Sequence, residues 1–480
     1  MVRKIDQFIN ELDRTVIDDL YRGVGSKPHE PMLMLRMGLY GNLLGQGSPA
    51  AWYTLTIDSK SMQWLIRGIR PSRSCCYNFR DRIGSALENL AAQVVNLCID
   101  EGLVRPKAGV QDGSTFRAAG SRHRVANMKT LTQRQATLAQ AIRQDQAGLP
   151  LEDAPKWMPT TPRGRRDLQQ RYEKAAQILA QRQQENAAKR KDRRLPENKV
   201  QVCLSEPEAP LGRDKERVFC PLYTSQYLVE PSSLLILNYG VFAQSTDAGT
   251  LPVMADTAQQ VLGYHLETII ADGAYASLID LRACDERGIE LIAGPEVPAK
   301  RRETKSAKQA NNAQTKTSKK PPKLDKSEFT WQPEEHTYRC PEGHLLTYCQ
   351  KDRVPRRGGE TLVELRFRCP PEHCLGCHRQ ANCVDNPAKG RVVKRLEGQE
   401  LLDAHQEKMK TDRARELYKL RGQVVERSFA DSKHHRKARR LHGRGLLRAK
   451  AEIGLLVLVQ NLLTVFRLRR KRANPENQVT

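Results

Sequence analysis

The stretch 266–295, LETIIADGAYASLIDLRACDERGIELIAGP, sets the fold class that this sequence predicts. Residues 266–275 hold a compact apolar strand that runs into Asp272 and a glycine. A short helix is expected over 277–287, and the apolar run 289–295 predicts a second strand. Strands that alternate with helices in this way are typical of α/β proteins.

Further strands are expected upstream of this stretch. The segment GVQDGSTFRA (109–118) predicts a short strand that ends in Asp112 and a glycine turn. Three β-rich runs follow at 199–206, 218–230 and 234–246, and then a helix is expected. Because these strands come close together before the helix–strand alternation begins, the predicted sheet is mixed, with some antiparallel strands.

The chain is strongly basic and too long for a single ordinary core. Its 480 residues suffice for about three domains, and 80 Lys and Arg against 55 Asp and Glu give a net charge of +25. That charge predicts a polyanionic partner, for which nucleic acid is the default. The apolar run 453–466 is too short to span a bilayer and predicts a buried helix, and residues 1–14 lack the apolar core of a signal peptide. We therefore expect a cytoplasmic, nucleoid-associated protein with no membrane partner.

Changes in composition divide the chain into six expected parts. They are an N-terminal helical DNA-binding domain (1–105), the first part of an α/β core (106–298) with a helical insertion (130–195), a disordered basic linker (299–327), a Cys-rich module (328–388), a C-terminal helical part of the core (389–472) and a disordered tail (473–480). In the first part, SRSCCYNFRDR (72–82) is basic and aromatic. It has two interpretations: a recognition helix whose Arg73 and Arg82 face DNA phosphates, and an ordinary solvated helix face.

Three carboxylates stand apart from the other acidic residues. Asp112 and Asp272 each follow an apolar strand and precede glycine, and Glu426 lies in the helical stretch YKLRGQVVERSFADSK (418–433). Glu426 and Asp431 are the only acids between positions 419 and 450, against eleven Lys and Arg. Each acid also has a purely structural interpretation, because Glu426 can pair with a neighbouring arginine and an Asp-Gly pair can be a turn.

Taken together, two aspartates on one sheet and a glutamate on a helix predict a metal site. Oxygen ligands of this kind suit Mg²⁺ or Mn²⁺. Two such ions about 3.5–4 Å apart can hold the attacking and leaving oxygens of a phosphodiester. Asp247, which also precedes small residues and begins an expected helix cap, is the rival of Asp272 for the second position. Asp431 either supports Glu426 or has no role in the site.

Six of the twelve cysteines fall between positions 340 and 383. With no export signal, such a cluster favours a metal site over a disulfide framework. We expect structural Zn²⁺ on Cys374, Cys377 and Cys383, with Cys340 or Cys369 as the fourth ligand and His344, His373 and His378 as substitutes. The metal would order a module that otherwise lacks apolar mass. The alternative is a set of reduced, partly buried thiols.

With these motifs in view, the sequence resembles the bacterial insertion-sequence transposases of the DDE type, most closely the IS1182 family within the IS4/IS5-like group. HEPMLMLRMGLYGNLLG (29–45) is similar to the helical domain that opens these proteins. DGSTFRAAGSRH (112–123) and IIADGAYAS (269–277) resemble the two aspartate motifs. Tyr418, Arg421, Glu426 and Lys433 match the family's Tyr-Arg-Glu-Lys signature, with one residue more between Arg and Glu than in related groups.

The resemblance implies an α/β ribonuclease-H-like catalytic core with a mixed sheet, and Asp112, Asp272 and Glu426 as a catalytic triad that binds two Mg²⁺ or Mn²⁺ ions. It implies cleavage at the inverted repeats of a transposon and transfer of the 3′-hydroxyl end into target DNA. It further implies that Arg421 and Lys433 contact DNA near the cut, that Tyr418 contacts a terminal nucleotide, and that a homodimer holds both transposon ends.

Two other functions remain compatible with the same residues. One is an inactive or domesticated DNA-binding relative that keeps the basic surface and the Cys-rich module. The other is a metal-dependent nuclease of the same fold that cuts DNA and does not join it. Retention of all three carboxylates favours an enzyme, and only a joined product separates a transposase from a nuclease.

Overall fold

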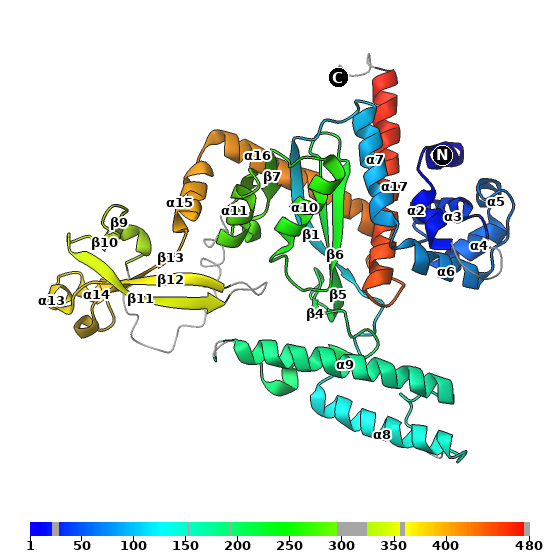
Figure 1. Ribbon diagram of the computed structural model, residues 1–480, viewed down its shortest axis with the longest axis horizontal. Helices are drawn as coiled ribbons and strands as arrows, with labels where there is room; N and C mark the ends of the chain where they lie inside the picture. The colour runs from blue at the N-terminus through cyan, green and yellow to red at the C-terminus, as the bar shows by residue number, and fades with distance from the viewer. Residues whose placement is uncertain are drawn as a thin grey trace, which may run out of the picture. The chain divides into compact units, whose positions relative to one another are not determined.

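The structure is a computed structural model that describes residues 1–21, 28–151, 153–189, 191, 194–294, 324–355 and 361–474. The chain divides into two compact units, one formed by Met1–Ile270 with Lys419–Thr480 and the other by Ala271–Tyr418. Figure 1 shows the course of the chain through both units. Most of the expected basic linker (299–327) and of the expected tail (473–480) lies outside the described residues.

The first unit begins with a series of helices: α1 (Val2–Asn10), α2 (Thr15–Asp18), α3 (Pro31–Leu43), α4 (Pro49–Asp58), α5 (Lys60–Leu65), α6 (Arg73–Ile83) and α7 (Leu87–Asp100). The four from α3 to α6 share one kind of start. In each, the side-chain oxygen of the preceding residue accepts a hydrogen bond from a backbone N–H of the first turn, and these residues are Glu30, Ser48, Ser59 and Ser72. Such capping satisfies N–H groups that have no partner within the helix.

A mixed sheet forms the centre of the first unit. Its middle strand, β1 (Ala108–Arg117), pairs antiparallel with β5 (Phe219–Val229) on one side and parallel with β7 (Thr268–Ala271) on the other. The strands β6 (Ile236–Phe242) and β4 (Leu211–Arg213) pair antiparallel with β5, and α10 (Thr250–Leu262) leads from β6 to β7. This arrangement agrees with the α/β class and the antiparallel strands that the sequence predicts.

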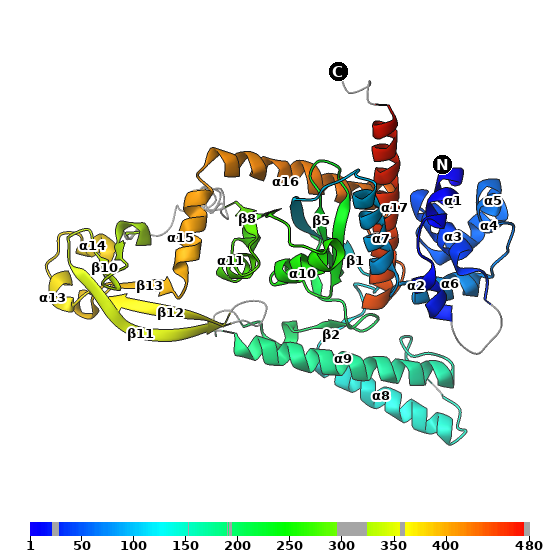
Figure 2. The same cartoon turned by 45° about the horizontal axis from the view of Figure 1, so that its top comes forward.

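The long helix α17 (Leu446–Ala473) is buried along α7 and β6 (Figure 2). The apolar run 453–466 therefore belongs to a buried helix, as predicted, but the helix is longer than expected, and by length and composition it could cross a membrane. Its most apolar window is 78% buried inside the protein. The Asn461 amide that interrupts the apolar run donates to Ile236 O at 2.8 Å and accepts from Ile236 N at 2.9 Å, which satisfies a buried polar group.

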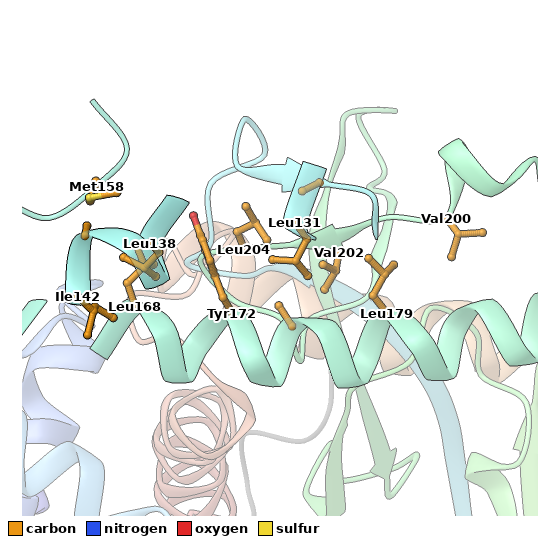
Figure 3. Packing of buried hydrophobic residues seen from close by; sticks show 13 residues of the cluster. Leu131, Leu138, Ile142, Met158, Leu168, Tyr172, Leu179, Val200, Val202 and Leu204 are labelled. Carbon is orange, nitrogen blue, oxygen red and sulfur yellow. The ribbon is translucent and has the colours of Figure 1, made fainter. Parts of the chain in front are cut away.

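The helical insertion is a hairpin with a hydrophobic core of its own. Its helices α8 (Met128–Gln146) and α9 (Pro162–Ala188) lie side by side (Figure 1), and Figure 3 shows the buried residues between them. The strand expected over 199–206 was largely wrong, because only β3 (Val202–Cys203) pairs, with β2 (Val125–Ala126). The apolar side chains of that segment, Val200, Val202 and Leu204, complete the hairpin core instead.

The second unit opens with α11 (Leu278–Asp285) and β8 (Glu290–Ala293) and contains an antiparallel sheet in the order β13-β12-β11-β10-β9. These strands are β9 (Thr330–Gln332), β10 (Thr337–Arg339), β11 (Leu345–Pro355), β12 (Thr361–Arg368) and β13 (Val392–Leu396), so the module continues past residue 388. Expecting it to lack apolar mass was wrong, because Trp331 and Tyr338 each pack edge to face against Phe367 in its core. The helix α15 (Gln399–Lys408) follows the module, and α16 (Asp412–Ala430) returns the chain to the first unit.

Candidate active site

One face of β1 carries the first predicted carboxylate. Asp112, Ser114 and Phe116 alternate along the strand and therefore point to the same side of the sheet. The sequence analysis expected Asp112 to end its strand. That expectation was wrong, because β1 continues to Arg117 and pairs with β5 throughout. The Asp-Gly pair is thus part of a regular ladder and not a turn.

Position 113 holds a glycine because two side chains come close to its backbone on the face of the sheet opposite Asp112. A Cβ atom at Gly113 would overlap the Asp247 carboxylate and the Gln226 amide, and Gln226 Nε2 donates to Asp247 Oδ1 at 2.6 Å. Glycine in a strand often marks such an approach. Because neighbouring residues of a strand point to opposite faces, Asp247 lies over the face that Asp112 does not use. The rival carboxylate is therefore close to β1 but on its other side.

Arg421 of α16 binds the Asp112 carboxylate directly. Its Nη1 donates to Asp112 Oδ2 at 3.1 Å, across 309 positions of sequence, and both side chains are partly exposed. Asp112 Oδ1 also accepts from the backbone N–H of Gly113 at 2.8 Å. The contact brings the helix of the Tyr-Arg-Glu-Lys signature onto the strand of the first aspartate motif.

Aromatic packing fixes α16 on the same face of the sheet. Phe429 stacks on Tyr227, with ring centroids 4.4 Å apart and planes inclined by 14°, and it also lies 6.4 Å from Phe116. Tyr227 is the direct partner of Asp112 in the β1–β5 register. Glu426 lies three residues before Phe429 and is exposed, so the helix presents it to solvent beside an anchored contact.

Asp272 directly follows β7, as the sequence predicts. Its carboxylate caps the short 3₁₀ turn η4 (Gly273–Tyr275), accepting from Ala274 N at 2.8 Å. β7 runs parallel to β1, with Val110 opposite Ile270. Asp112 lies two residues after Val110, and Asp272 lies two residues after Ile270.

The other signature residues have defined surroundings. Lys433 lies in a π-helical turn, η7 (Asp431–His435), that follows α16, and its ammonium donates to Ser114 Oγ at 2.6 Å and to Thr115 O at 2.8 Å. Burial lowers the pKa of Lys433 to about 8, with the positive charges of Lys215 and Arg439 acting in the same direction. In the second unit, the ring of Tyr418 packs against the backbone at Gly294.

The two arginines predicted to face DNA lie on α6. Arg73 is exposed in its first turn, and its guanidinium lies 6.0 Å from the centre of the Tyr77 ring. Arg82 is exposed in the last turn, 5.2 Å from the Tyr21 ring. Both guanidinium groups lie at the surface, and their contact with DNA stays a prediction.

The cysteine cluster surrounds a small cavity of about 30 Å³ in the second unit. Five of its cysteines line the cavity, together with His344 and His373, and they are Cys340, Cys369, Cys374, Cys377 and Cys383. Two glycine turns with positive φ, at Gly343 and Gly376, carry the chain around it. Burial, followed by the neighbouring thiol of Cys374, raises the pKa of Cys369 to about 12. Cys349 is exposed, at the bulge of β11, and does not line the cavity.

In the part of the chain that the structure describes, no group of three His, Cys, Asp or Glu side chains is arranged to hold a metal ion. The sequence analysis also missed three side chains that lie on the side of the sheet that carries Asp112, namely Ser114 of β1, Tyr227 of β5 and Phe429 of α16. The alternation of Asp112, Ser114 and Phe116 was a signal for the first of them, because it marks one face of a strand. The Tyr227–Phe429 stack joins distant segments and has no local signal.

Comparison with known proteins gives one match. Residues 339–466, about a quarter of the chain, match the family model described as Transposase DDE domain. No curated protein and no solved structure matches the chain. The matched segment contains Arg421, Glu426, Lys433 and the cysteine cluster, and its similarity to a transposase DDE domain supports a DDE transposase, a class of protein that acts on DNA and generally uses divalent metal ions.

Proposed function

We propose that this protein is a transposase that cuts DNA at the inverted repeats of a transposon and joins the 3′-hydroxyl ends to target DNA. In this proposal it is a member of the IS1182 family with a ribonuclease-H-like core, and Asp112, Asp272 and Glu426 are its catalytic carboxylates. The family match supports the class of enzyme. The residue assignment is our inference from the sheet and from α16.

The observation that carries the assignment is the ion pair between Arg421 and Asp112. It joins the segment that matches the family model to a strand that lies outside that segment. With Phe429 stacked on Tyr227, the register partner of Asp112, the helix that carries Glu426 is anchored beside the first aspartate.

The register of β1 and β7 supports Asp272 as the second carboxylate. Both aspartates follow the Val110–Ile270 pair by two residues, so they occupy corresponding positions along two parallel neighbouring segments. Asp247 fits less well, because it faces the opposite side of β1 at Gly113.

The donor chemistry of the three carboxylates suits Mg²⁺ or Mn²⁺, since all the donors are oxygens. When bound, two such ions would activate water or a 3′-hydroxyl and stabilise the leaving oxygen. The chain itself positions the carboxylates and surrounds them with cations. The expected cations are Arg421 and Lys433 at the site and the exposed Arg73 and Arg82 on α6, with Tyr418 as a contact of the terminal nucleotide.

Two further parts of the proposal concern partners. A homodimer that holds two transposon ends would bring two copies of the site onto one DNA target. The cysteine-lined cavity would hold a structural Zn²⁺, since its five thiols exceed the four ligands of a tetrahedral site. A thiol cluster inside a small fold with its own aromatic core suits a stabilising role better than a catalytic one.

A cleavage and joining assay tests the proposed function. Labelled transposon-end DNA and a target plasmid are incubated with Mg²⁺ and the wild type, Asp112→Ala, Asp272→Ala or Glu426→Ala. We expect cut and joined products from the wild type and a loss of at least about 10³-fold from each variant, because each removes a group that acts on the transition state. DNA affinity should be retained, and Asp247→Ala is the matched control that should keep activity.

Each other outcome selects a different function. Cleavage without joined product would indicate a nuclease of the same fold. Metal-independent DNA binding without cleavage by the wild type would indicate a DNA-binding relative. An active Asp272→Ala beside an inactive Asp247→Ala would move the second carboxylate to Asp247.

A further inference from the structure

A cavity of about 470 Å³ lies in the first unit, and none of the three candidate carboxylates lines it. Its lining comes from α16 with the turn η7, from α17, and from Leu234 in the turn between β5 and β6. Cavities that bind small molecules have volumes of roughly 300–1,000 Å³. This one is therefore large enough for a ligand of the size of a nucleotide.

Two arginines from different helices line this cavity, Arg427 of α16 and Arg467 of α17. Both side chains are exposed, so a ligand can reach them. Burial lowers the pKa of Arg467, and the positive charge of Arg427 acts in the same direction. The two guanidinium groups thus repel each other across the cavity, and an anion bound between them would relieve that repulsion.

The acid in the cavity lining does not neutralise this pair. Asp431 lies four residues after Arg427, but its two carboxylate oxygens accept from Arg436 at 3.1 and 3.2 Å. The Arg467 guanidinium donates to Ser233 O, which carries no charge. With the residues that the structure describes, the Arg427 guanidinium forms neither a hydrogen bond nor an ion pair. The cavity therefore offers positive charge to a ligand.

The rest of the lining combines polar and apolar surface. Ser428 is 1% exposed, and both its Oγ and Gln460 Oε1 are buried without a hydrogen-bond partner among the described residues. Buried polar atoms are nearly always hydrogen-bonded, so these two are suited to a polar group of a ligand. Leu234, Ala430 and Leu463 supply the apolar surface.

We propose that this cavity binds a nucleoside phosphate, with the phosphate between Arg427 and Arg467 and the base against the apolar residues. Guanidinium groups bind phosphate oxygens through paired N–H donors. A free nucleotide and the 5′-phosphorylated end of a DNA strand carry this same chemical group. The site goes beyond the proposed function and does not depend on it, because the candidate carboxylates take no part in the cavity.

Calorimetric titration of the full chain with deoxyadenosine 5′-monophosphate tests the proposal. We expect saturable binding of one nucleotide per chain and no binding of deoxyadenosine, which lacks the phosphate. Arg427→Gln should weaken the binding at least about tenfold, the loss expected when a charge-assisted contact is removed. This variant should unfold at the wild-type temperature, because the guanidinium it removes has no partner among the described residues.

Three further variants separate a cavity from a diffuse basic surface. Arg467→Gln should weaken nucleotide binding as Arg427→Gln does. Arg470→Gln is the matched control, since it removes an equal charge from an exposed position of α17 outside the cavity, and it should keep the wild-type affinity. Ala430→Trp places a large side chain in the cavity without changing the charge and should abolish binding.

A competition experiment identifies the source of the phosphate. Two single-stranded oligonucleotides that differ only in a 5′-phosphate or a 5′-hydroxyl are added to the protein–nucleotide complex. If the phosphorylated strand alone displaces the nucleotide, the cavity accepts the 5′ end of DNA. If neither strand displaces it, the ligand is a free nucleotide, and both results support the site.

The proposal is overturned if nucleotide binding is not saturable, or if Arg427→Gln and Arg470→Gln weaken it equally. Unchanged affinity in Ala430→Trp would also overturn it, because binding would then lie elsewhere. Should Arg467→Gln not fold after losing its bond to Ser233 O, Arg427→Gln and Ala430→Trp decide the question. A wild type that cleaves no DNA contradicts the proposed function alone, since the nucleotide titration contains no DNA.

Discussion

Arg421 places a positive charge on the carboxylate that we assign to the metal site. Its guanidinium donates to Asp112 Oδ2, one of the oxygens that a divalent cation would use. A charge-assisted hydrogen bond of this kind competes with a cation for the same lone pairs. We infer that Arg421 holds Asp112 in the DNA-free protein and turns to a phosphate when DNA supplies a stronger partner.

This inference predicts tighter metal binding when the arginine is removed. In DNA-free protein, Arg421→Ala should lower the dissociation constant for Mn²⁺ about two- to fivefold, the size expected for a partly exposed ion pair. Titration followed by electron paramagnetic resonance measures the free ion directly. The same variant should cleave DNA more slowly, because it lacks the proposed phosphate contact.

Arg415→Ala is the control for this measurement. Arg415 lies on the same helix and pairs only locally with Asp412 among the contacts that the structure gives it, so its loss removes an equal charge without freeing Asp112. If Arg421→Ala binds Mn²⁺ no more tightly than the wild type does, and no differently from Arg415→Ala, then Arg421 does not compete with the metal ion for Asp112.

At this scale the sequence picks out candidate carboxylates but does not predict what they touch. Asp112, Asp272 and Glu426 were found from strand patterns and from an acid among eleven basic residues. The partner of Asp112 could not be found in the same way, because it comes from 309 positions away. Gly113 was misread as a turn because a glycine required by a close approach has the same local sequence as one required by a positive φ.

At the scale of elements, burial decided what could be predicted. The strands β5 and β6 and the helix α10 appear where expected, because continuous apolar runs and helical periodicity are local signals. The run 199–206 has the composition of a strand and instead fills the core of the α8–α9 hairpin. The π-helical turn after α16 had no local signal, since it depends on packing against Tyr227 and β1.

The Cys-rich module is the element with the clearest test of its own. Protein purified without chelators should contain one zinc ion per chain by mass spectrometry, and chelation should expose Trp331, which can be followed by its fluorescence. Cys374→Ser should lose the metal, because this buried thiol lines the cavity.

Cys349→Ser is the matched control, since this exposed residue lies outside the cavity, and it should keep the zinc. Wild-type protein that carries no zinc and does not respond to chelators would show that the module is held by its aromatic core alone. That core, built on Trp331, Tyr338 and Phe367, makes this outcome physically reasonable and the measurement decisive.

At the scale of the whole molecule, the chain is a strongly basic protein whose proposed site is assembled from three distant segments. The net charge of +25 predicts steep salt dependence of DNA binding but does not locate the site. The segment similar to a transposase DDE domain supplies Glu426 and the cysteines, and both aspartates lie before it. The central claim is therefore that Asp112, Asp272 and Glu426 bind the same metal centre.

Iron-directed cleavage of the protein tests that claim most directly. Fe²⁺ replaces Mg²⁺ on the DNA-bound protein, and ascorbate with peroxide generates hydroxyl radicals that cut the backbone close to the bound metal. We predict cuts near residues 112, 272 and 426, all lost in Asp112→Ala and all suppressed by excess Mg²⁺. Cuts confined to one of these segments, or found only in the Cys-rich module, would contradict a shared metal centre and the function proposed for this protein.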